Sequence, residues 1–223
     1  MTSVYQACLL VLASILLGCS GGSDVPYAQM IGDPLRKPSP APEDVSRLTP
    51  QWIAALTTPA LEVTLERSGR VAVLSPFSDR RDSAGGAVRI WRSADGAQIV
   101  LRGGVLIATR GLGNDVDSTL AQTMIAALSA RAPVSGHHVL YTVTTENSTK
   151  AVDLSCQSKL IDDDFIDIAG RQIETRQVRV TCRWGAETKV YDFWVDAGGS
   201  TVRQSQQWAG PDLGYIRTRL LNE

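Results

Sequence analysis

Apolar and polar residues alternate along most of the carboxyl-terminal half of the chain, with the two-residue period of a β-strand. After Pro133 this pattern predicts six strands, at residues 138–145, 151–160, 173–184, 189–195, 201–208 and 215–221. Short turns that contain Gly, such as residues 184–187 and 196–199, separate consecutive strands. Such close connections are typical of antiparallel hairpins.

The region before Pro133 contains shorter apolar runs between glycines. These runs predict strands at residues 61–67, 71–74, 87–91, 98–101 and 105–109. A short helix is expected at residues 49–56, where Thr49 can cap the helix and Pro50 can occupy its first position.

A second, longer helix is expected between residues 117 and 130, because apolar residues recur there every three or four positions. The predicted fold class is therefore mainly β, as an antiparallel β-barrel or a strongly curved sheet with one or two short helices. We expect one folded domain over residues 48–223.

The amino-terminal segment is typical of a bacterial lipoprotein precursor. Residues 7–17 form an uncharged apolar run of signal-peptide length, whereas a membrane span needs roughly 20 such residues. The following Leu16-Leu17-Gly18-Cys19 resembles a lipobox, in which a small residue precedes the cysteine whose thiol accepts a diacylglycerol. We therefore expect a signal peptide at residues 1–18 and a lipidated Cys19 whose acyl chains, palmitate among them, bind a membrane.

Two observations bear on that expectation from opposite sides. Residues 1–6 contain no Lys or Arg, whereas signal peptides usually begin with positive charge. The alternative to a signal peptide is a buried apolar helix in which Cys19 is a small apolar core residue. Six of the ten prolines lie between residues 20 and 50, however, which favours an extended spacer over a packed helix. Residues 19–47 are thus predicted to be a lipidated, Pro-rich tether. In enterobacterial lipoproteins Ser20 after the cysteine would imply the outer membrane, facing the periplasm.

The cysteines of the predicted domain occupy matching positions in two strands. Cys156 shares the apolar side of its strand with Leu154, and Cys182 shares the apolar side of its strand with Val180. Both thiols are expected to point into the core. In an exported chain this arrangement favours a Cys156–Cys182 disulfide, and two reduced core cysteines are the alternative.

Charge and motif content argue against several functions. The chain has 22 Lys and Arg against 23 Asp and Glu, which leaves no field to attract nucleic acid. His137 and His138 are adjacent, so they point to opposite faces of a strand and cannot readily share a metal ion or form an acid-base pair. The three aspartates at residues 162–164 lack the ligand spacing of a calcium-binding loop, and we expect them in a solvated loop. No phosphate-binding loop, nucleophile elbow or paired-carboxylate pattern is present. We expect no catalytic residues, no metal and no cofactor.

The tryptophans near the carboxyl end could contact a glycan or a protein partner. Trp194 and Trp208 have polar sequence neighbours, so one face of each ring is expected to be exposed, although tryptophans more often lie in the core. Arg203 lies between them in an Arg-Gln-Ser-Gln run and is a third candidate contact. A buried hydrogen-bond network is the alternative role of that run.

Two segments near the carboxyl end carry a more specific pattern: Tyr-Asp-Phe-Trp-Val-Asp at residues 191–196 and Val-Arg-Gln-Ser-Gln-Gln-Trp-Ala-Gly at residues 202–210. Together with the lipobox and residues 109–112, they resemble the YjbF/GfcB family of capsule and exopolysaccharide lipoproteins. The resemblance covers residues 50–223 and implies an outer-membrane lipoprotein with a barrel-like fold, encoded with polysaccharide secretion genes. It carries over no catalytic residues.

The resemblance and the predicted anchor together imply a non-enzymatic accessory lipoprotein for capsule or exopolysaccharide export or assembly. Its expected partners are a membrane, a polysaccharide and proteins of the export machinery. The alternative is a periplasmic carrier or chaperone that holds a lipid or acylated glycan in an apolar cavity. A glycan-modifying enzyme is a third possibility, for which the sequence shows no catalytic pattern.

Overall fold

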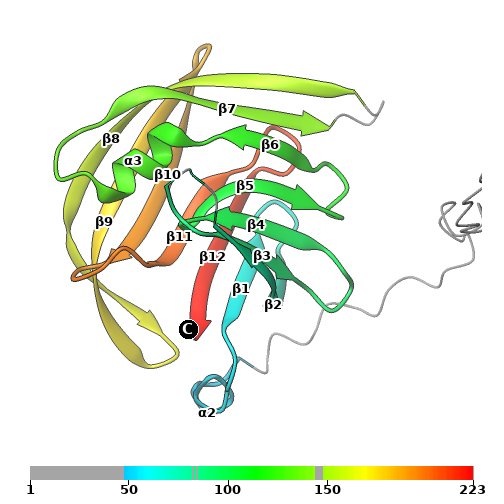
Figure 1. Cartoon of the computed structure of the whole chain (residues 1–223), viewed down its shortest axis with the longest axis vertical. Helices are drawn as coiled ribbons and strands as arrows, with labels where there is room; N and C mark the ends of the chain where they lie inside the picture. The colour runs from blue at the N-terminus through cyan, green and yellow to red at the C-terminus, as the bar shows by residue number, and fades with distance from the viewer. Residues whose placement is uncertain (1–47, 82, 84, 144–147, 223) are drawn as a thin grey trace, which may run out of the picture. The chain divides into compact units, whose positions relative to one another are not determined.

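One antiparallel sheet of twelve strands forms the described part of the chain and curves into a nearly closed barrel (Figure 1). The computed structural model describes residues 48–222, except 82, 84 and 144–147, so the expected signal peptide, lipidated Cys19 and tether lie outside it. The mainly β prediction is confirmed. The strands are β1 (Ala60–Leu65), β2 (Arg70–Arg80), β3 (Val88–Arg92), β4 (Gln98–Arg102), β5 (Val105–Arg110), β6 (Val116–Leu120), β7 (Ser135–Val143), β8 (Thr149–Ile168), β9 (Arg171–Trp184), β10 (Glu187–Asp196), β11 (Val202–Trp208) and β12 (Tyr215–Asn222).

The strand order places the two ends of the domain side by side and leaves β5 and β6 as the sheet edges. Hydrogen-bonded neighbours follow the order β5-β4-β3-β2-β1-β12-β11-β10-β9-β8-β7-β6. Every adjacent pair except β1 and β12 is therefore consecutive in the chain. In that one long-range pair, Leu61 lies opposite Leu220 on β12 and also opposite Leu74 on β2.

The predicted strands recur in the structure, and two predictions are wrong. Residues 116–120 form β6, although the sequence pattern predicts a helix from residue 117 onward. Within β6, Leu120 pairs with Val139 of β7 and is 47% exposed. Pairing with β7 thus outweighs the helical spacing of a short segment. The three aspartates at 162–164 lie within β8 rather than in a loop: Asp162 is in a bulge, after which β9 pairs again with Asp163 and Asp164.

Side chains join the two sheet edges. The Thr109 hydroxyl on β5 accepts from the backbone N–H of Val116 on β6 at 2.9 Å and donates to Asp115 at 2.7 Å. The Arg110 guanidinium donates to the Val116 carbonyl at 3.1 Å, and Thr119 donates to the Leu106 carbonyl at 3.3 Å. The side chains thus bind backbone N–H and C=O groups of the edge strands, which a neighbouring strand would bind in a continuous sheet.

The two helices within the described residues lie on different sides of the sheet. In α2 (Pro50–Ala54) the Thr49 side chain accepts from the Trp52 N–H, as predicted, and Ile53 packs on the outer face against Leu221. In α3 (Gln122–Ser129) the buried residues pack into the barrel core, with Met124 completely buried. A Cβ atom at Gly136 of β7 would lie 2.5 Å from Thr123 Oγ1, so the close packing of α3 requires glycine there.

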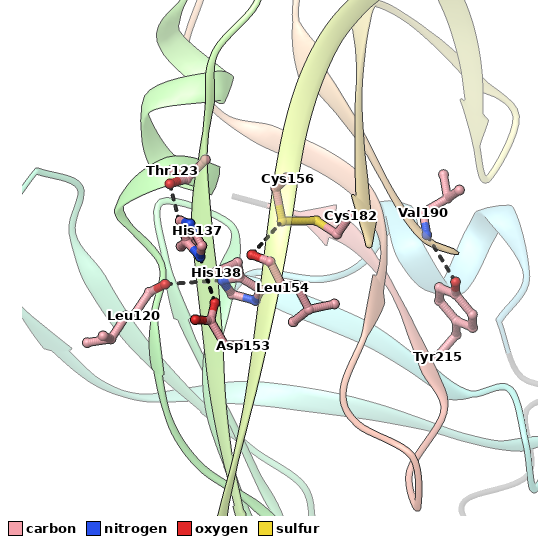
Figure 2. The surroundings of a disulfide bond; sticks show 10 residues. All are labelled: Leu120, Thr123, His137, His138, Asp153, Leu154, Cys156, Cys182, Val190 and Tyr215. Carbon is pink, nitrogen blue, oxygen red and sulfur yellow. Dashed lines mark hydrogen bonds and ion pairs between the residues drawn. A yellow bond between two sulfur atoms is a disulfide. The ribbon is translucent and has the colours of Figure 1, made fainter. Parts of the chain in front are cut away.

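A disulfide joins Cys156 of β8 and Cys182 of β9 inside the barrel (Figure 2). The two residues are direct partners in the β8–β9 register, with Cα atoms 4.0 Å apart. Both side chains are buried, as their strand alternation predicts. Under the loop-entropy account, a bridge between residues this far apart in sequence stabilises the fold by about 3.5 kcal/mol.

The two adjacent histidines of β7 point to opposite sides of the sheet. His137 is exposed and contacts Asp153 at 2.8 Å, whereas His138 is buried beside Tyr191, edge to face at 5.5 Å between ring centroids. His138 Nδ1 donates to the Leu120 carbonyl at 3.2 Å (Figure 2). Burial lowers the pKa of His138 from its ordinary 6.5 to about 4, so the folded protein holds this ring neutral.

The low pKa of His138 predicts an acid-dependent loss of stability. Between pH 6.5 and 4 the unfolded chain binds a proton that the folded chain excludes, so the free energy of unfolding falls as the pH falls. From pH 7 to pH 4.5 this loss amounts to about 2.5 kcal/mol. Urea unfolding of detergent-solubilised protein at both pH values should show that His138→Phe removes most of this loss, whereas the matched His137→Phe variant retains it. Equal pH dependence in the wild type and both variants would refute the assignment.

Candidate functional site

A cavity of about 620 Å³ opens into one end of the barrel. Its mouth is formed by residues of the β2–β3 loop, the β4–β5 turn, the β10–β11 turn and the end of α3. Its inner wall consists of interior side chains that include Leu61, Trp91, Leu101 and Leu220, each no more than 7% exposed. The volume and apolar lining are those of a site for a small molecule or an acyl chain.

Two arginines, Arg81 and Arg89, line the mouth of this cavity. Arg89 binds Asp79 through two hydrogen bonds of 2.7 and 3.0 Å, and its guanidinium lies 5.3 Å from the centroid of the Trp91 ring. The hydrogen bond from Arg89 lowers the pKa of Asp79, so this ion pair persists into acid. Arg81 lies exposed on the same side of the opening. Because Asp79 neutralises Arg89, an anionic group on a bound molecule would meet Arg81 at this mouth.

A buried hydrogen-bond network forms the polar part of the cavity wall. Gln207 on β11 donates from Nε2 to the Gly104 carbonyl and to Ser205 Oγ, both at 2.9 Å, and its Oε1 accepts from the Leu106 N–H at 2.8 Å. The Ser205 and Thr218 hydroxyls are 2.7 Å apart. Gly104 and Thr218 both line the cavity, so Gln207 holds the β4–β5 turn against β11.

Glycine at position 104 is required by this arrangement for two reasons. The residue has a φ of +88°, a left-handed conformation that side chains disfavour. A Cβ atom there would also lie 2.4 Å from the Cβ of Val202 on β11. The turn can therefore approach β11 closely enough for Gln207 to reach its backbone.

The three proposed contact residues do not form one exposed surface. Trp208 is 3% exposed and packs in the core, with its ring 5.6 Å from that of Trp184 and with Lys189 Nζ 5.0 Å from its centroid. The expectation of an exposed Trp208 face is therefore wrong, because the ring points inward from β11. Trp194 is half-buried on the outer face, against the cluster that includes Ile53.

Arg203 is held in an ion pair. Its Nε and Nη2 donate to the two carboxylate oxygens of Asp196 at 2.6 and 2.7 Å, and both side chains are about one-fifth exposed. This bidentate pair clamps the β10–β11 turn beside the cavity mouth. Contact of Trp194 or Arg203 with a glycan or partner stays a prediction.

Residues 48–222, apart from the undescribed positions, contain no group of three or more His, Cys, Asp and Glu that could hold a metal ion. Among the same residues, no helix has the length and apolarity needed to cross a membrane.

The barrel is similar to a solved structure of a lipoprotein. The crystal structure of the hypothetical lipoprotein YmcC from Escherichia coli (K12) superposes with a TM-score of 0.67 and 22% sequence identity, over 79% of this chain and 89% of that one. At this level of identity the similarity establishes the fold alone. No curated protein matches the chain.

A family profile gives the broader assignment. The family described as "Group 4 capsule polysaccharide lipoprotein gfcB, YjbF" matches residues 28–221. This match includes the sheet except its last residue, Asn222, together with the disulfide and the cavity network, and it agrees with the resemblance noted in the sequence. Because the match spans most of the sequence, the chain belongs to the YjbF/GfcB family of capsule polysaccharide lipoproteins.

Proposed function

We propose that this protein is a non-enzymatic accessory lipoprotein in the export or assembly of a capsule or exopolysaccharide. The match of residues 28–221 to a family of capsule polysaccharide lipoproteins is the observation that carries the proposal. The lipobox at Leu16-Leu17-Gly18-Cys19 supplies the attachment point that such a protein needs. Several acyl chains on Cys19 would anchor it stably, since a single chain binds membranes only marginally.

The proposed place of action is the periplasmic face of the outer membrane. Ser20 after the lipidated cysteine favours the outer membrane, and the buried Cys156–Cys182 disulfide suits an oxidising compartment. The Pro-rich tether of residues 19–47 would let the barrel reach tens of ångströms from the bilayer, at about 3 Å per residue of extended chain. The domain could then meet a polysaccharide or export proteins away from the lipid surface.

Deletion of the gene in a polysaccharide-producing strain should lower the amount of polymer at the cell surface. Complementation with the wild-type gene should restore it. A Cys19→Ser gene should not, because the unanchored barrel folds but is lost from the membrane fraction or retains its signal peptide. Surface polymer is measured by uronic acid or total hexose assay, together with immunoblots of membrane fractions.

Unchanged surface polymer in the deletion strain would contradict the proposed role. Normal membrane fractionation of the Cys19→Ser protein would instead contradict the anchor alone. The two outcomes are read from different assays, so the anchor and the role can fail independently.

The cavity favours a second candidate function, a carrier for a lipid or an acylated glycan. Its interior wall is mostly apolar, Arg81 and the Arg89–Asp79 ion pair lie at its mouth, and its volume of about 620 Å³ suits one or more acyl segments. An amphiphile with an anionic head group would place its chain against Trp91 and Leu101 and its head group near Arg81.

A substitution at the cavity mouth tests the carrier function. Ser129 and Ala126 are both exposed on α3, but only Ser129 lines the cavity. Ser129→Trp should therefore reduce binding of the fluorescent fatty acid cis-parinaric acid by about tenfold, the effect of lost apolar burial, and Ala126→Trp should not. Native mass spectrometry of envelope-purified protein should show a non-covalent lipid adduct that Ser129→Trp loses. No binding by the wild type in either assay would reject the carrier role.

A further inference from the structure

A second hollow lies on the outer face of the barrel, away from the cavity. It has a volume of about 410 Å³ and is bordered by α2 on one side and by β2 and the end of β3 on the other. Its aromatic members are Trp52 and Phe77, and its polar members include Arg92, Ser75 and Thr58. We call this hollow the α2–β2 groove.

A β-bulge presents Phe77 to the α2–β2 groove. Along the β2–β3 ladder Pro76 pairs with Trp91 and Ser78 pairs with Ile90, which leaves Phe77 as the extra residue. Proline donates no ladder hydrogen bond, so Pro76 suits this break in pairing. Bulges re-aim a side chain at functional places in sheets, and Phe77 is 56% exposed as a result.

A cation lies beside the exposed ring. The Arg92 guanidinium is centred 5.0 Å from the centroid of Phe77, and Arg92 is the partner of Ser75 in the sheet, on the same outer face. Among the residues that the structure describes, no carboxylate forms an ion pair with Arg92, in contrast to Arg89 and Arg203. Its charge is thus available to an anion that enters the groove.

The opposite side of the α2–β2 groove is held rigid. Trp52 is 37% exposed on α2, whose first turn is capped by the Thr49 hydroxyl and whose Ile53 is buried in the outer cluster. Two apolar rings therefore face the same open hollow from separate elements, and hydroxyl groups and the Arg92 guanidinium line the hollow with them.

We propose that the α2–β2 groove binds a segment of an acidic polysaccharide. The C–H face of a sugar ring packs on a flat aromatic surface such as Phe77 or Trp52. The Arg92 guanidinium binds a uronate or other carboxylate of the chain, and the serine and threonine hydroxyls bind sugar hydroxyls. An acyl chain suits this groove less well, because the open hollow mixes polar and apolar groups. The assignment rests on the proposed role in polysaccharide export or assembly and names the ligand class.

Binding of the extracellular polysaccharide purified from the producing strain tests the proposal. The full-length protein, solubilised in detergent, is titrated with the polymer before and after chemical reduction of its carboxyl groups, and Trp fluorescence and affinity electrophoresis report binding. Phe77→Ala should weaken binding by about tenfold or more, the effect of losing one stacked ring. Arg92→Gln should abolish the preference for the unreduced polymer.

A matched control separates the groove from general exposure of aromatic rings. Phe165 on β8 is 64% exposed and lies outside the groove, so Phe165→Ala should bind the polymer like the wild type. All three altered side chains are exposed, and equal urea unfolding midpoints will show that the variants fold.

Three results would overturn the proposal: no binding of the polymer, wild-type affinity in Phe77→Ala and Arg92→Gln, or equal loss of affinity in Phe165→Ala. A cross-linked protein partner at Trp52 or Phe77 in cells, with no polymer binding, would assign the groove to that protein instead. The proposed function has a separate readout, because the deletion strain reports on polymer export without reference to the groove.

Discussion

A sheet that curves into a nearly closed barrel must satisfy the backbone groups of its two edge strands, and in this protein side chains do so. Gln207 accepts from the Leu106 N–H at 2.8 Å, while Thr109 accepts from the Val116 N–H at 2.9 Å. A buried backbone donor without a partner costs about 1–3 kcal/mol. Gln207 and Thr109 therefore stabilise the curvature on which the cavity, the packing of α3 and the position of the β4–β5 turn all depend.

The same network links the family resemblance to the candidate site. In the Arg-Gln-Ser-Gln-Gln-Trp run of β11, Ser205 and Gln207 point inward to the cavity wall, whereas Gln206 points outward and donates to Glu66. Ser205 and Gln207 of the run thus support the cavity wall from behind its lining residues Gly104 and Thr218. The outer face of the barrel offers a different site, the α2–β2 groove, so one fold can present an apolar interior and a sugar-binding exterior.

Alternation and turn residues predicted nearly all of the strands because a barrel with one buried face imposes a strict two-residue period. The period also placed Cys156 and Cys182 on the inner face. The prediction failed where pairing outweighs local pattern, as in β6, and where polar neighbours hid an inward ring, as at Trp208. The cavity and the bulge at Phe77 arise from contacts between distant strands, which no local pattern encodes. The buried polar residues Ser205 and Gln207, inside an otherwise apolar alternation, were the available signal for the site.

Amide hydrogen exchange at Leu106 tests most directly whether Gln207 closes the barrel. The variant Gln207→Met keeps the length of the side chain but removes its hydrogen bonds. We expect amide exchange at Leu106 and along β5 to become about tenfold faster or more, while exchange in β1 and β12 stays unchanged. Gln206→Met, one residue away on the outer face, should leave β5 protected. Unchanged protection of Leu106 in Gln207→Met would contradict the account.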